Sequence, residues 1–303
     1  MLYTMKSDGT EQKMLKGAWS FFTSGREPLL SPDGERIVFA QGNTSGRWAM
    51  IVNADGSELD TLVEATFYSW VYAEDWSPDG GKLVYTLGSY FNFLQTVVYV
   101  IDPDGSGRLR LDEGSDPRFC GNDKVVYSRN DGIYIIGTKG EDRTRLQETP
   151  YGAGLYVPAG SPDGKKVAFC RALVISPPNR KCWLEIIEPD GSGQIKLAEM
   201  SGLFSFAEIE FSPDSKRIMF LAVGETSAEI EIYVVNVDGS DLRPLTDNSA
   251  SANGHARWSP DGSRIVFTST KDGNPEIYTV NTSGPPVMRR LTNNLADDCN
   301  PDW

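Results

Sequence analysis

The stretch Trp258-Ser259-Pro260-Asp261-Gly262-Ser263-Arg264-Ile265-Val266-Phe267 decides the fold. Its centre predicts a tight turn, because proline presets φ at the second turn position, aspartate accepts hydrogen bonds from nearby backbone amides and glycine tolerates positive φ. The residues that follow are β-branched and aromatic, as a buried strand requires. The stretch therefore predicts two strands joined by a short turn.

This stretch recurs along the chain. Its Ser-Pro-Asp core precedes an apolar strand at four other places, which begin at Ser31, Ser77, Ser161 and Ser212. The turn aspartates at positions 33, 79, 163, 214 and 261 are separated by 46, 84, 51 and 47 residues. The interval of 84 equals two steps of 42, so we expect a decayed copy near Asn122-Asp123, ahead of Val125-Val126-Tyr127.

A second series of turns lies between these copies, usually as Asp-Gly. The turns are Asp8-Gly9, Asp55-Gly56, Asp104-Gly105, Lys139-Gly140, Asp190-Gly191, Asp238-Gly239 and Ser283-Gly284. Each follows an apolar strand and precedes a short segment ending in leucine, so one period contains four short strands, a to d. A repeat of about 40–45 residues with four strands predicts a β-propeller blade. A ring of such blades buries both faces of every sheet and leaves only short edges.

The two chain ends fall inside a repeat. A c–d pair opens the chain at residues 2–15, six a–b–c–d units follow, and Asn300-Pro301-Asp302-Trp303 matches a further strand a. We therefore expect residues 1–303 to form one all-β domain, a propeller of four-stranded antiparallel blades that starts and ends in mid-blade. Seven blades with one strand missing are favoured; six blades with overhanging ends are the alternative, and a fragment of a longer protein is a further option.

Composition limits the classes of partner. The 303 residues include 42 acidic and 29 basic side chains, which gives a formal charge of −13. This charge argues against nucleic acid, whose phosphates need a basic surface. No apolar run approaches the ~18 residues of a membrane span, and the N-terminus lacks the pattern of a signal peptide. We expect a monomer without membrane insertion, cytoplasmic as written and periplasmic or extracellular if the N-terminus is truncated.

Few residues suit metal or cofactor chemistry. The chain has one histidine, His255, and four cysteines without a Cys-x-x-Cys pair, so no zinc site is expected. Cys170 and Cys182 are predicted to be two buried thiols in one hairpin, with a disulfide as the alternative. Asp102–Gly105 and its relatives share part of a calcium-loop pattern, but the downstream glutamate is absent and turn capping is favoured. We expect no cofactor and keep calcium as the minor alternative.

Catalytic motifs are also missing from the sequence. A serine hydrolase needs Gly-x-Ser-x-Gly, and this pentapeptide does not occur. No dinucleotide fingerprint and no P-loop lysine occur either. These absences predict that the chain is not an enzyme by itself.

Charged residues precede the strand-a aromatic in several repeats. They are Asp75, Arg118, Glu210, Arg257 and Asp302. Strand a lines the central channel of a propeller, so we expect these side chains to ring the channel mouth. Two interpretations are open: the residues pair with one another across the mouth, or they bind a peptide tail or an ion.

Aromatic residues mark the opposite part of the repeat. Strand alternation places the d–a and b–c loops on one rim and the short turns on the other. The long loops carry six aromatic residues in adjacent repeats, namely Tyr68, Trp70, Tyr72, Tyr90, Phe91 and Phe93. Aromatic side chains are enriched at interface hot spots, which predicts a binding face on this long-loop rim. Packing of half of them into their own loops is the alternative.

The turn and its flanks, Trp-Ser-Pro-Asp-Gly followed by Arg/Lys, Ile/Leu, Val and Phe/Tyr, resemble the repeat of TolB-type propellers, also called WD40-like or PD40 repeats. The Leu-Thr pairs at Leu245 and Leu291 and the final Asn-Pro-Asp-Trp fit the same pattern, and the resemblance covers essentially the whole chain. The family's type member is a periplasmic protein of the bacterial Tol–Pal system, with a signal peptide and an α/β domain that this sequence does not show. The repeat is also similar to the propeller that gates prolyl-oligopeptidase-like serine peptidases.

These observations predict a non-catalytic propeller that binds a protein or peptide on its long-loop rim and at its channel mouth. The alternative is the gating propeller of a serine peptidase whose catalytic domain lies outside this chain. A carbohydrate- or metal-dependent propeller enzyme is disfavoured by the single histidine.

Overall fold

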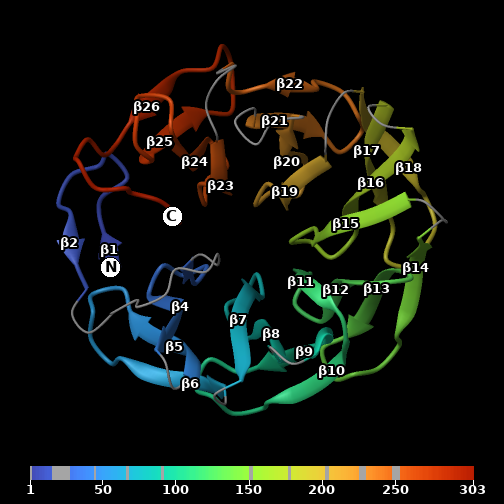
Figure 1. Ribbon diagram of the computed structural model, residues 1–303, viewed down its shortest axis with the longest axis horizontal. Helices are drawn as coiled ribbons and strands as arrows, with labels where there is room; N and C mark the ends of the chain where they lie inside the picture. The colour runs from blue at the N-terminus through green and yellow to red at the C-terminus, as the bar shows by residue number, and fades with distance from the viewer. Residues whose placement is uncertain are drawn as a thin grey trace.

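The computed structural model describes residues 2–15, 28–43, 46–65, 68–89, 92–149, 153–176, 179–201, 205–224, 230–247 and 253–303. Their strands form six four-stranded antiparallel sheets and one two-stranded sheet. The sheets are arranged around a common axis, with the first strand of each nearest that axis (Figure 1). The predicted all-β propeller is confirmed, and its six complete blades match the six-bladed alternative.

Each blade uses four strands that are consecutive in the chain. Blades 1 to 3 consist of β3 (Leu29–Leu30), β4 (Arg36–Asn43), β5 (Gly46–Asn53) and β6 (Asp60–Ala65); β7 (Ser69–Trp76), β8 (Leu83–Ser89), β9 (Asn92–Ile101) and β10 (Leu109–Glu113); and β11 (Ser115–Cys120), β12 (Lys124–Arg129), β13 (Gly132–Gly137) and β14 (Thr144–Glu148). Blades 4 to 6 consist of β15 (Ala153–Gly160), β16 (Val167–Ser176), β17 (Asn179–Ile187) and β18 (Ile195–Ser201); β19 (Ser205–Phe211), β20 (Arg217–Val223), β21 (Ile230–Asn236) and β22 (Arg243–Pro244); and β23 (Asn253–Trp258), β24 (Arg264–Ser269), β25 (Glu276–Asn281) and β26 (Met288–Arg290). The remaining sheet pairs β1 (Tyr3–Thr4) with β2 (Lys13–Met14).

The recurring turn is held by side chains of its own. In blade 6 the Ser259 hydroxyl donates to Asp261 at 2.6 Å and accepts the amide of Arg264 at 2.9 Å. Hydrogen bonds from Ser259 and Ser263 lower the pKa of Asp261 to about 2. Gly262 has φ of 66°, a positive angle that glycine adopts without steric strain, which explains why glycine occupies this turn position. The decayed copy around Asn122 keeps its turn, between β11 and β12.

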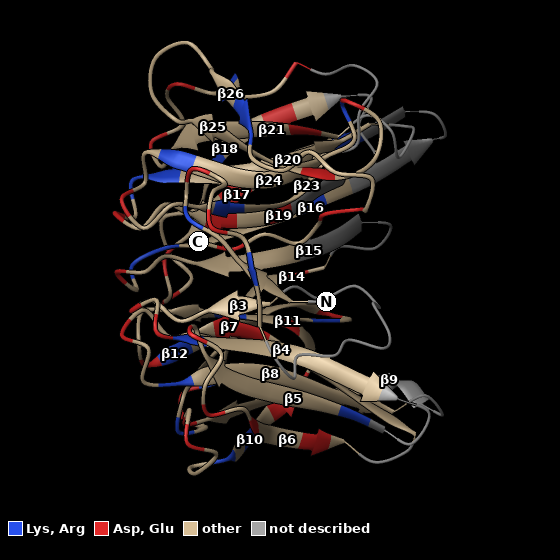
Figure 2. Cartoon of the chain, turned by 90° about the vertical axis from the view of Figure 1, so that its left-hand side faces the viewer, with Lys and Arg blue, Asp and Glu red and all other residues tan. Residues whose placement is uncertain are grey.

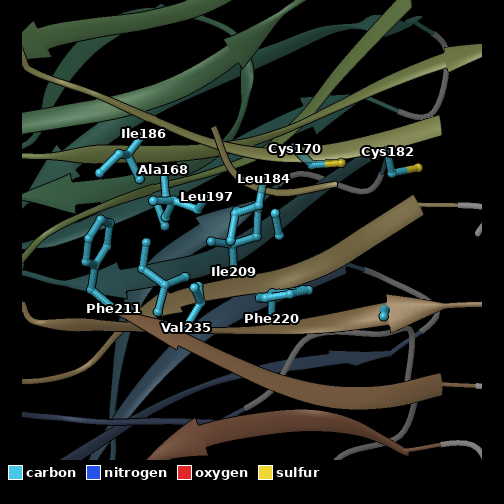
Figure 3. Close-up of a cluster of buried hydrophobic side chains, with 14 residues drawn as sticks. Ala168, Cys170, Cys182, Leu184, Ile186, Leu197, Ile209, Phe211, Phe220 and Val235 are labelled. Atoms are coloured by element: carbon cyan, nitrogen blue, oxygen red, sulfur yellow. The ribbon is translucent and has the colours of Figure 1, made fainter. Parts of the chain in front are cut away.

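Packing between blades forms the core. Between blades 4 and 5, Leu184, Ile186 and Leu197 meet Ile209 and Phe211 in one buried cluster (Figure 3). A single four-stranded sheet would leave both of its apolar faces in water, so each blade depends on its neighbours.

The same cluster contains the two cysteines of the blade-4 hairpin. Cys170 and Cys182 are buried and are not joined by a disulfide, as predicted (Figure 3). Their burial makes them part of the apolar packing between blades.

Strand a bulges just before its inner end. The register of the strand a–strand b pairing shifts in blades 2 to 6, and in blades 3 to 6 a non-glycine residue of the bulge has positive φ. These residues are Asp116, Val157, Glu208 and His255. Asn300 has φ of 59° at the matching position, so the C-terminal segment 300–303 adopts the same backbone turn as the inner strands.

Tryptophans of strand a connect neighbouring blades. Trp258 donates its indole N–H to the Glu210 carbonyl at 3.3 Å, and the Arg217 guanidinium lies 4.8 Å from its ring centre. Trp76 makes the equivalent contacts with Leu29 and Arg36. Each such tryptophan therefore combines a hydrogen bond with a cation–π contact to the preceding blade.

The C-terminal segment uses the same contacts to close the ring. Trp303 donates to the Arg257 carbonyl at 3.0 Å and lies under Arg264 at 5.0 Å, both in blade 6. Asp302 accepts the amide of Leu30 in blade 1 at 2.7 Å. The segment therefore joins the last complete blade to the first without a covalent bond.

The β1–β2 sheet lies in the same sector, between blade 6 and blade 1 (Figure 1). Leu2 and Leu15 pack on Ile37 and Phe39 of blade 1. On the other side, Arg289 of blade 6 donates to the Asp8 carbonyl at 3.1 Å. Among the described residues, the seventh position of the ring thus contains a c–d pair and a strand-a segment.

Because Trp303 closes the ring, its replacement should destabilise the whole propeller. We expect Trp303→Ala to lower the free energy of unfolding by about 1–3 kcal/mol, and Trp303→Phe, which loses only the indole N–H, by about 1 kcal/mol. Urea denaturation followed by far-UV circular dichroism measures both. Leu295→Ala removes a fully exposed side chain and serves as the control, with little change expected. Equal stability of Trp303→Ala and the wild type would contradict the closure.

Candidate functional site

The predicted charged residues lie at the inner ends of the strands nearest the axis. Asp75, Glu210 and Arg257 are the second-last residues of β7, β19 and β23, and Arg118 lies two residues before the end of β11. Asp302 occupies the matching place in the C-terminal segment. We call these five residues the channel cluster. All are partly buried.

Electrostatic effects show that the channel cluster is one group. Burial raises the pKa of Asp75, although Arg118 and Arg257 act in the opposite direction. Burial also raises the pKa of Glu210 to about 8, against the attraction of Arg257 and with further increases from Asp302 and Asp75. Residues from four complete blades and the C-terminal segment therefore influence one another electrostatically. That they bind a ligand stays a prediction.

Two carboxylates of the cluster are held by neighbouring backbone. Asp75 accepts the amide of Phe119 from blade 3 at 2.8 Å, just as Asp302 accepts the amide of Leu30. Next to them, the buried Glu74 accepts the Thr86 hydroxyl at 2.7 Å and lies 3.5 Å from Arg118. These contacts give Asp75 and Asp302 a structural role in joining blades, in addition to any binding role.

Glu210 differs from the other carboxylates. Among the described residues its buried Oε2 atom has no hydrogen-bond partner. A buried carboxyl oxygen without a partner costs about 1–3 kcal/mol. Glu210 is therefore the group in the channel cluster that a ligand can still satisfy.

The predicted aromatic residues occupy the other end of β7. The rings of Trp70 and Tyr72 lie 4.9 Å apart, and Arg47 of blade 1 donates to the Tyr72 hydroxyl at 2.8 Å. Tyr68, just before the strand, is 52% exposed. We call Tyr68, Trp70, Tyr72 and Arg47 the rim patch.

Trp70 is seated on a glycine. Gly88 is its partner across β7 and β8, and a Cβ atom built at Gly88 would lie 2.3 Å from the Trp70 ring. The absence of a side chain at this position lets the indole lie against the backbone. Of the other predicted rim aromatics, Tyr90 and Phe91 lie outside the described residues, and so does the side chain of Phe93.

The two surfaces are separate. Trp70 and Asp75 are five positions apart in one strand, which corresponds to about 15 Å. Figure 2 shows the short turns, many with acidic or basic residues, along its left-hand rim. The channel cluster lies near this rim, and the rim patch lies at the opposite end of the blades.

Neighbours across strands and blades were not identified from the sequence. Glu74 could have been noticed in the sequence, because it is an acidic residue within a mostly apolar strand a. Arg47 and Gly88 carried none, because their importance depends on which residues face them across the sheet.

Two complete blades have no charged residue at the position of the channel cluster. Leu29 occupies this position in blade 1 and Ala159 in blade 4, so the ring of charge is incomplete there.

Metal binding has limited support in the described part of the chain. No three His, Cys, Asp or Glu side chains among these residues are placed to hold one ion. In the calcium-like turn, Asp104 accepts the amide of Ser106 at 2.9 Å, and Asp102 pairs with Lys82 at 2.6 Å. Asp104 thus caps the turn and Asp102 forms an ion pair, and calcium stays the minor, untested alternative.

A shallow hollow of about 400 Å³ lies at the short-turn rim between blades 3 and 4. Its lining includes Lys124, Lys165 and Lys166. Lys166 is paired with Glu188 at 2.9 Å and Lys165 with Asp163 at 3.6 Å. This hollow therefore resembles an ordinary charged surface more than a built anion site.

No helix in the described residues is long and apolar enough to cross a lipid bilayer.

Comparison with known proteins agrees with the fold. The family model for the TolB beta propeller domain matches residues 151–303. TolB from Acinetobacter baumannii gives a TM-score of 0.58 at 18% identity, over 85% of this chain and 63% of that chain. An oligogalacturonate lyase in complex with manganese gives a TM-score of 0.65 at 16% identity, over 85% of this chain and 78% of that chain. At such identities the likeness concerns the fold alone.

A curated relative is a peptidase. Dipeptidyl-peptidase 5 of Porphyromonas endodontalis is 30% identical over 125 residues, which is 39% of this chain and 17% of that protein. The chain thus corresponds to a small part of that relative's length. The activity of the whole peptidase does not follow from this match.

The raised pKa of Glu210 predicts that stability depends on pH. Between the unfolded-state value of about 4.3 and the folded value of about 8, the unfolded chain has lost a proton that the folded chain keeps. Stability should therefore fall as pH rises through this window. Glu210→Gln should flatten the dependence and be more stable than the wild type at pH 8.

Thermal unfolding from pH 5 to 9 measures this difference. Glu113→Gln, which changes an exposed carboxylate of β10, is the matched control and should keep the slope of the wild type. If Glu210→Gln and the wild type lose stability in parallel, Glu210 is ionised throughout and its burial has been misjudged.

Proposed function

The chain belongs to the family of TolB beta propeller domains, and on this premise we propose that it is a non-catalytic scaffold that binds a protein or peptide. The partner contacts the rim patch and the channel cluster. The unpartnered Oε2 atom of Glu210 carries the proposal, because a hydrogen-bond donor from a ligand would satisfy it.

The geometry favours an extended ligand for the channel. The rim patch and the channel cluster are about 15 Å apart along β7, a distance that about five extended residues span. At the rim, aromatic rings beside a guanidinium provide apolar area and hydrogen bonds together. At the cluster, guanidinium and carboxyl groups can pair with charged side chains or with a chain end. A peptide that enters from the rim can therefore reach both surfaces.

A catalytic role has less support. The described residues contain no site for a metal held by three or more His, Cys, Asp or Glu side chains, and the sequence contains no nucleophile elbow. Most of the ionisable side chains near the axis are held by backbone or by one another. A scaffold without chemistry of its own is consistent with both observations.

The second candidate function is the gating propeller of a serine peptidase. The match to dipeptidyl-peptidase 5, 30% identical over 125 residues, is the observation that favours it. In that case the catalytic groups lie in a domain outside this chain, and the channel guides substrate peptides. Discovery of a covalently linked hydrolase domain in the native protein would favour this candidate.

Neutralising the channel cluster should weaken binding without unfolding the ring. A partner is first captured from the native organism on the immobilised chain, identified by mass spectrometry and purified. We expect the double variant Glu210→Gln/Arg257→Gln to bind it at least about 10-fold more weakly in isothermal titration calorimetry, because the loss of the Arg257 guanidinium alone removes a charge-assisted hydrogen bond that contributes about 1.5–3 kcal/mol.

Arg110→Gln/Glu113→Gln neutralises an exposed acid–base pair and is the matched control. It should bind as the wild type does. If the cluster variant keeps its affinity but loses its stability, the residues are structural and the channel proposal fails.

A second test separates the rim from the channel. Gly88→Ala should push the Trp70 ring out of place, because the new Cβ would lie 2.3 Å from it, and Trp70→Ala should remove the ring altogether. Both variants should bind the purified partner more weakly than the wild type in the same titration, by a similar factor of about 5 or more. Gly254→Ala, a strand glycine with open space around it, is the control. Unchanged affinity in both variants would exclude the rim patch from the interface.

A further inference from the structure

The two arginines of the channel cluster are held in the same way. Arg118 donates from Nη1 to the Pro117 carbonyl at 3.0 Å. Arg257 donates from Nη1 to the Ala256 carbonyl at 2.9 Å. Burial raises the pKa of Asp75, and both guanidinium groups act against this rise. Two positive groups from blades 3 and 6 are therefore fixed near the same carboxyl before any ligand arrives.

Arg118 keeps donors for a further group. Its Nη1 atom also donates to Glu74 at 3.5 Å, and the side chain is 25% exposed. Its Nε and Nη2 atoms make no hydrogen bond with the residues that the structure describes. A guanidinium presents a planar fork of N–H donors, which matches the two oxygens of a carboxylate. Arg118 can therefore bind an anion that reaches it from solvent.

The carboxyl groups of the cluster already accept hydrogen bonds from the backbone. Asp75 and Asp302 each accept an amide of the neighbouring blade. Glu210 accepts a backbone hydrogen bond from Trp258 of blade 6 in the same way. The raised pKa of Asp75 also makes this carboxyl less negative at neutral pH than an exposed one. These groups therefore attract a cationic ligand less than their number suggests.

The second oxygen of Glu210 can donate as well as accept. This Oε2 atom is buried and has no partner among the described residues. Burial raises the pKa of the carboxyl to about 8, which leaves it mostly protonated at pH 7. A protonated carboxyl has one O–H donor, and this donor needs an acceptor from the ligand. Together with the two arginines, Glu210 thus completes a set of donors near the axis.

We propose that the channel cluster binds the C-terminal carboxylate of a peptide between Arg118, Arg257 and Glu210. This inference rests on the proposed function, because it names the part of the peptide that reaches the channel. A chain that enters from the rim patch and runs along β7 meets the cluster with its end, about five residues further on. A carboxylate only accepts hydrogen bonds, so it suits a place lined by two guanidinium groups and a protonated carboxyl.

The amino end of a peptide fits this place less well. An ammonium group has three donors and no acceptor. It would compete with backbone amides for the oxygens of Asp75 and Asp302, and it would lie beside two groups of its own charge. The arrangement of donors therefore favours the carboxyl end.

Two libraries of N-acetylated random pentapeptides test this inference. Both are built without Asp and Glu, so that the acid library has one carboxylate, at its C-terminus, and the amidated library has none. Each is passed over the immobilised chain at pH 7, and the retained peptides are quantified by mass spectrometry. We expect the acid library to be retained at least about 10-fold better, because the amide loses the charge-assisted hydrogen bonds.

Variants assign the carboxylate to the named groups. Arg118→Gln should lower retention of the acid library at least about 5-fold. Arg110→Gln, which neutralises an exposed arginine of β10, is the matched control and should leave it unchanged. Glu210→Leu should also lower retention, and Glu210→Gln, which restores an N–H donor, should recover most of the loss. Circular dichroism confirms that each variant is folded.

Equal retention of the two libraries would overturn the carboxylate inference and leave peptide binding, and with it the proposed function, in place. An acid preference that Arg118→Gln does not reduce would overturn the inference too. Stronger retention of a third library, with free amino ends and amidated carboxyl ends, would assign the cluster to the opposite chain end. Retention of neither of the first two libraries would also contradict the inference, whereas the proposed function is judged separately, by the titration of the purified partner.

Discussion

Packing between blades is the constraint on which the rest of the structure depends. A four-stranded sheet with apolar residues on both faces cannot be stable in water by itself. The clusters between blades, such as that around Leu184 and Phe211, show how neighbours cover these faces. Arrangement around an axis follows, because a ring is the arrangement in which every sheet has a neighbour on each side.

The ring also explains why charge accumulates near its axis. Inner strands from different blades approach one another there, so groups that are distant in the sequence share one partly buried space. Asp75, Glu210 and Arg257 influence one another in this way, although they come from three blades. Burial raises the pKa of Glu210, because its environment provides too little water to stabilise the anion.

Much of this architecture could be predicted from the sequence. The turn around Asp261 and the β-branched residues after it indicate strands, and their spacing indicates blades, because both depend on local chemistry. The charged position before the strand-a aromatic could be identified for the same reason, since four complete repeats and the C-terminal segment present it in the same place. Blade number was harder: the sequence favoured seven, whereas in the part of the chain that the structure describes six blades are complete and the seventh position holds a strand pair and a segment.

Contacts between distant positions could not be predicted. The partners Arg47 for Tyr72 and Gly88 for Trp70 depend on register across strands and blades, which spacing along the chain does not give. The positive φ of Val157 was likewise hidden, because a β-branched residue is the least expected there. The separation of the two candidate surfaces also needed coordinates, since it depends on which end of one strand each residue occupies.

The noncovalent junction at Trp303 and Asp302 affects where the ring opens locally. A closed array of similar repeats loosens first where the packing between neighbours is weakest, and among the described residues blade 6 and blade 1 are joined through the C-terminal segment and the two-stranded β1–β2 sheet. Amide protons in β1, β2 and the C-terminal segment should consequently exchange with solvent earlier than those of the blades opposite. The contacts that close the ring are therefore also the part of it that opens most easily.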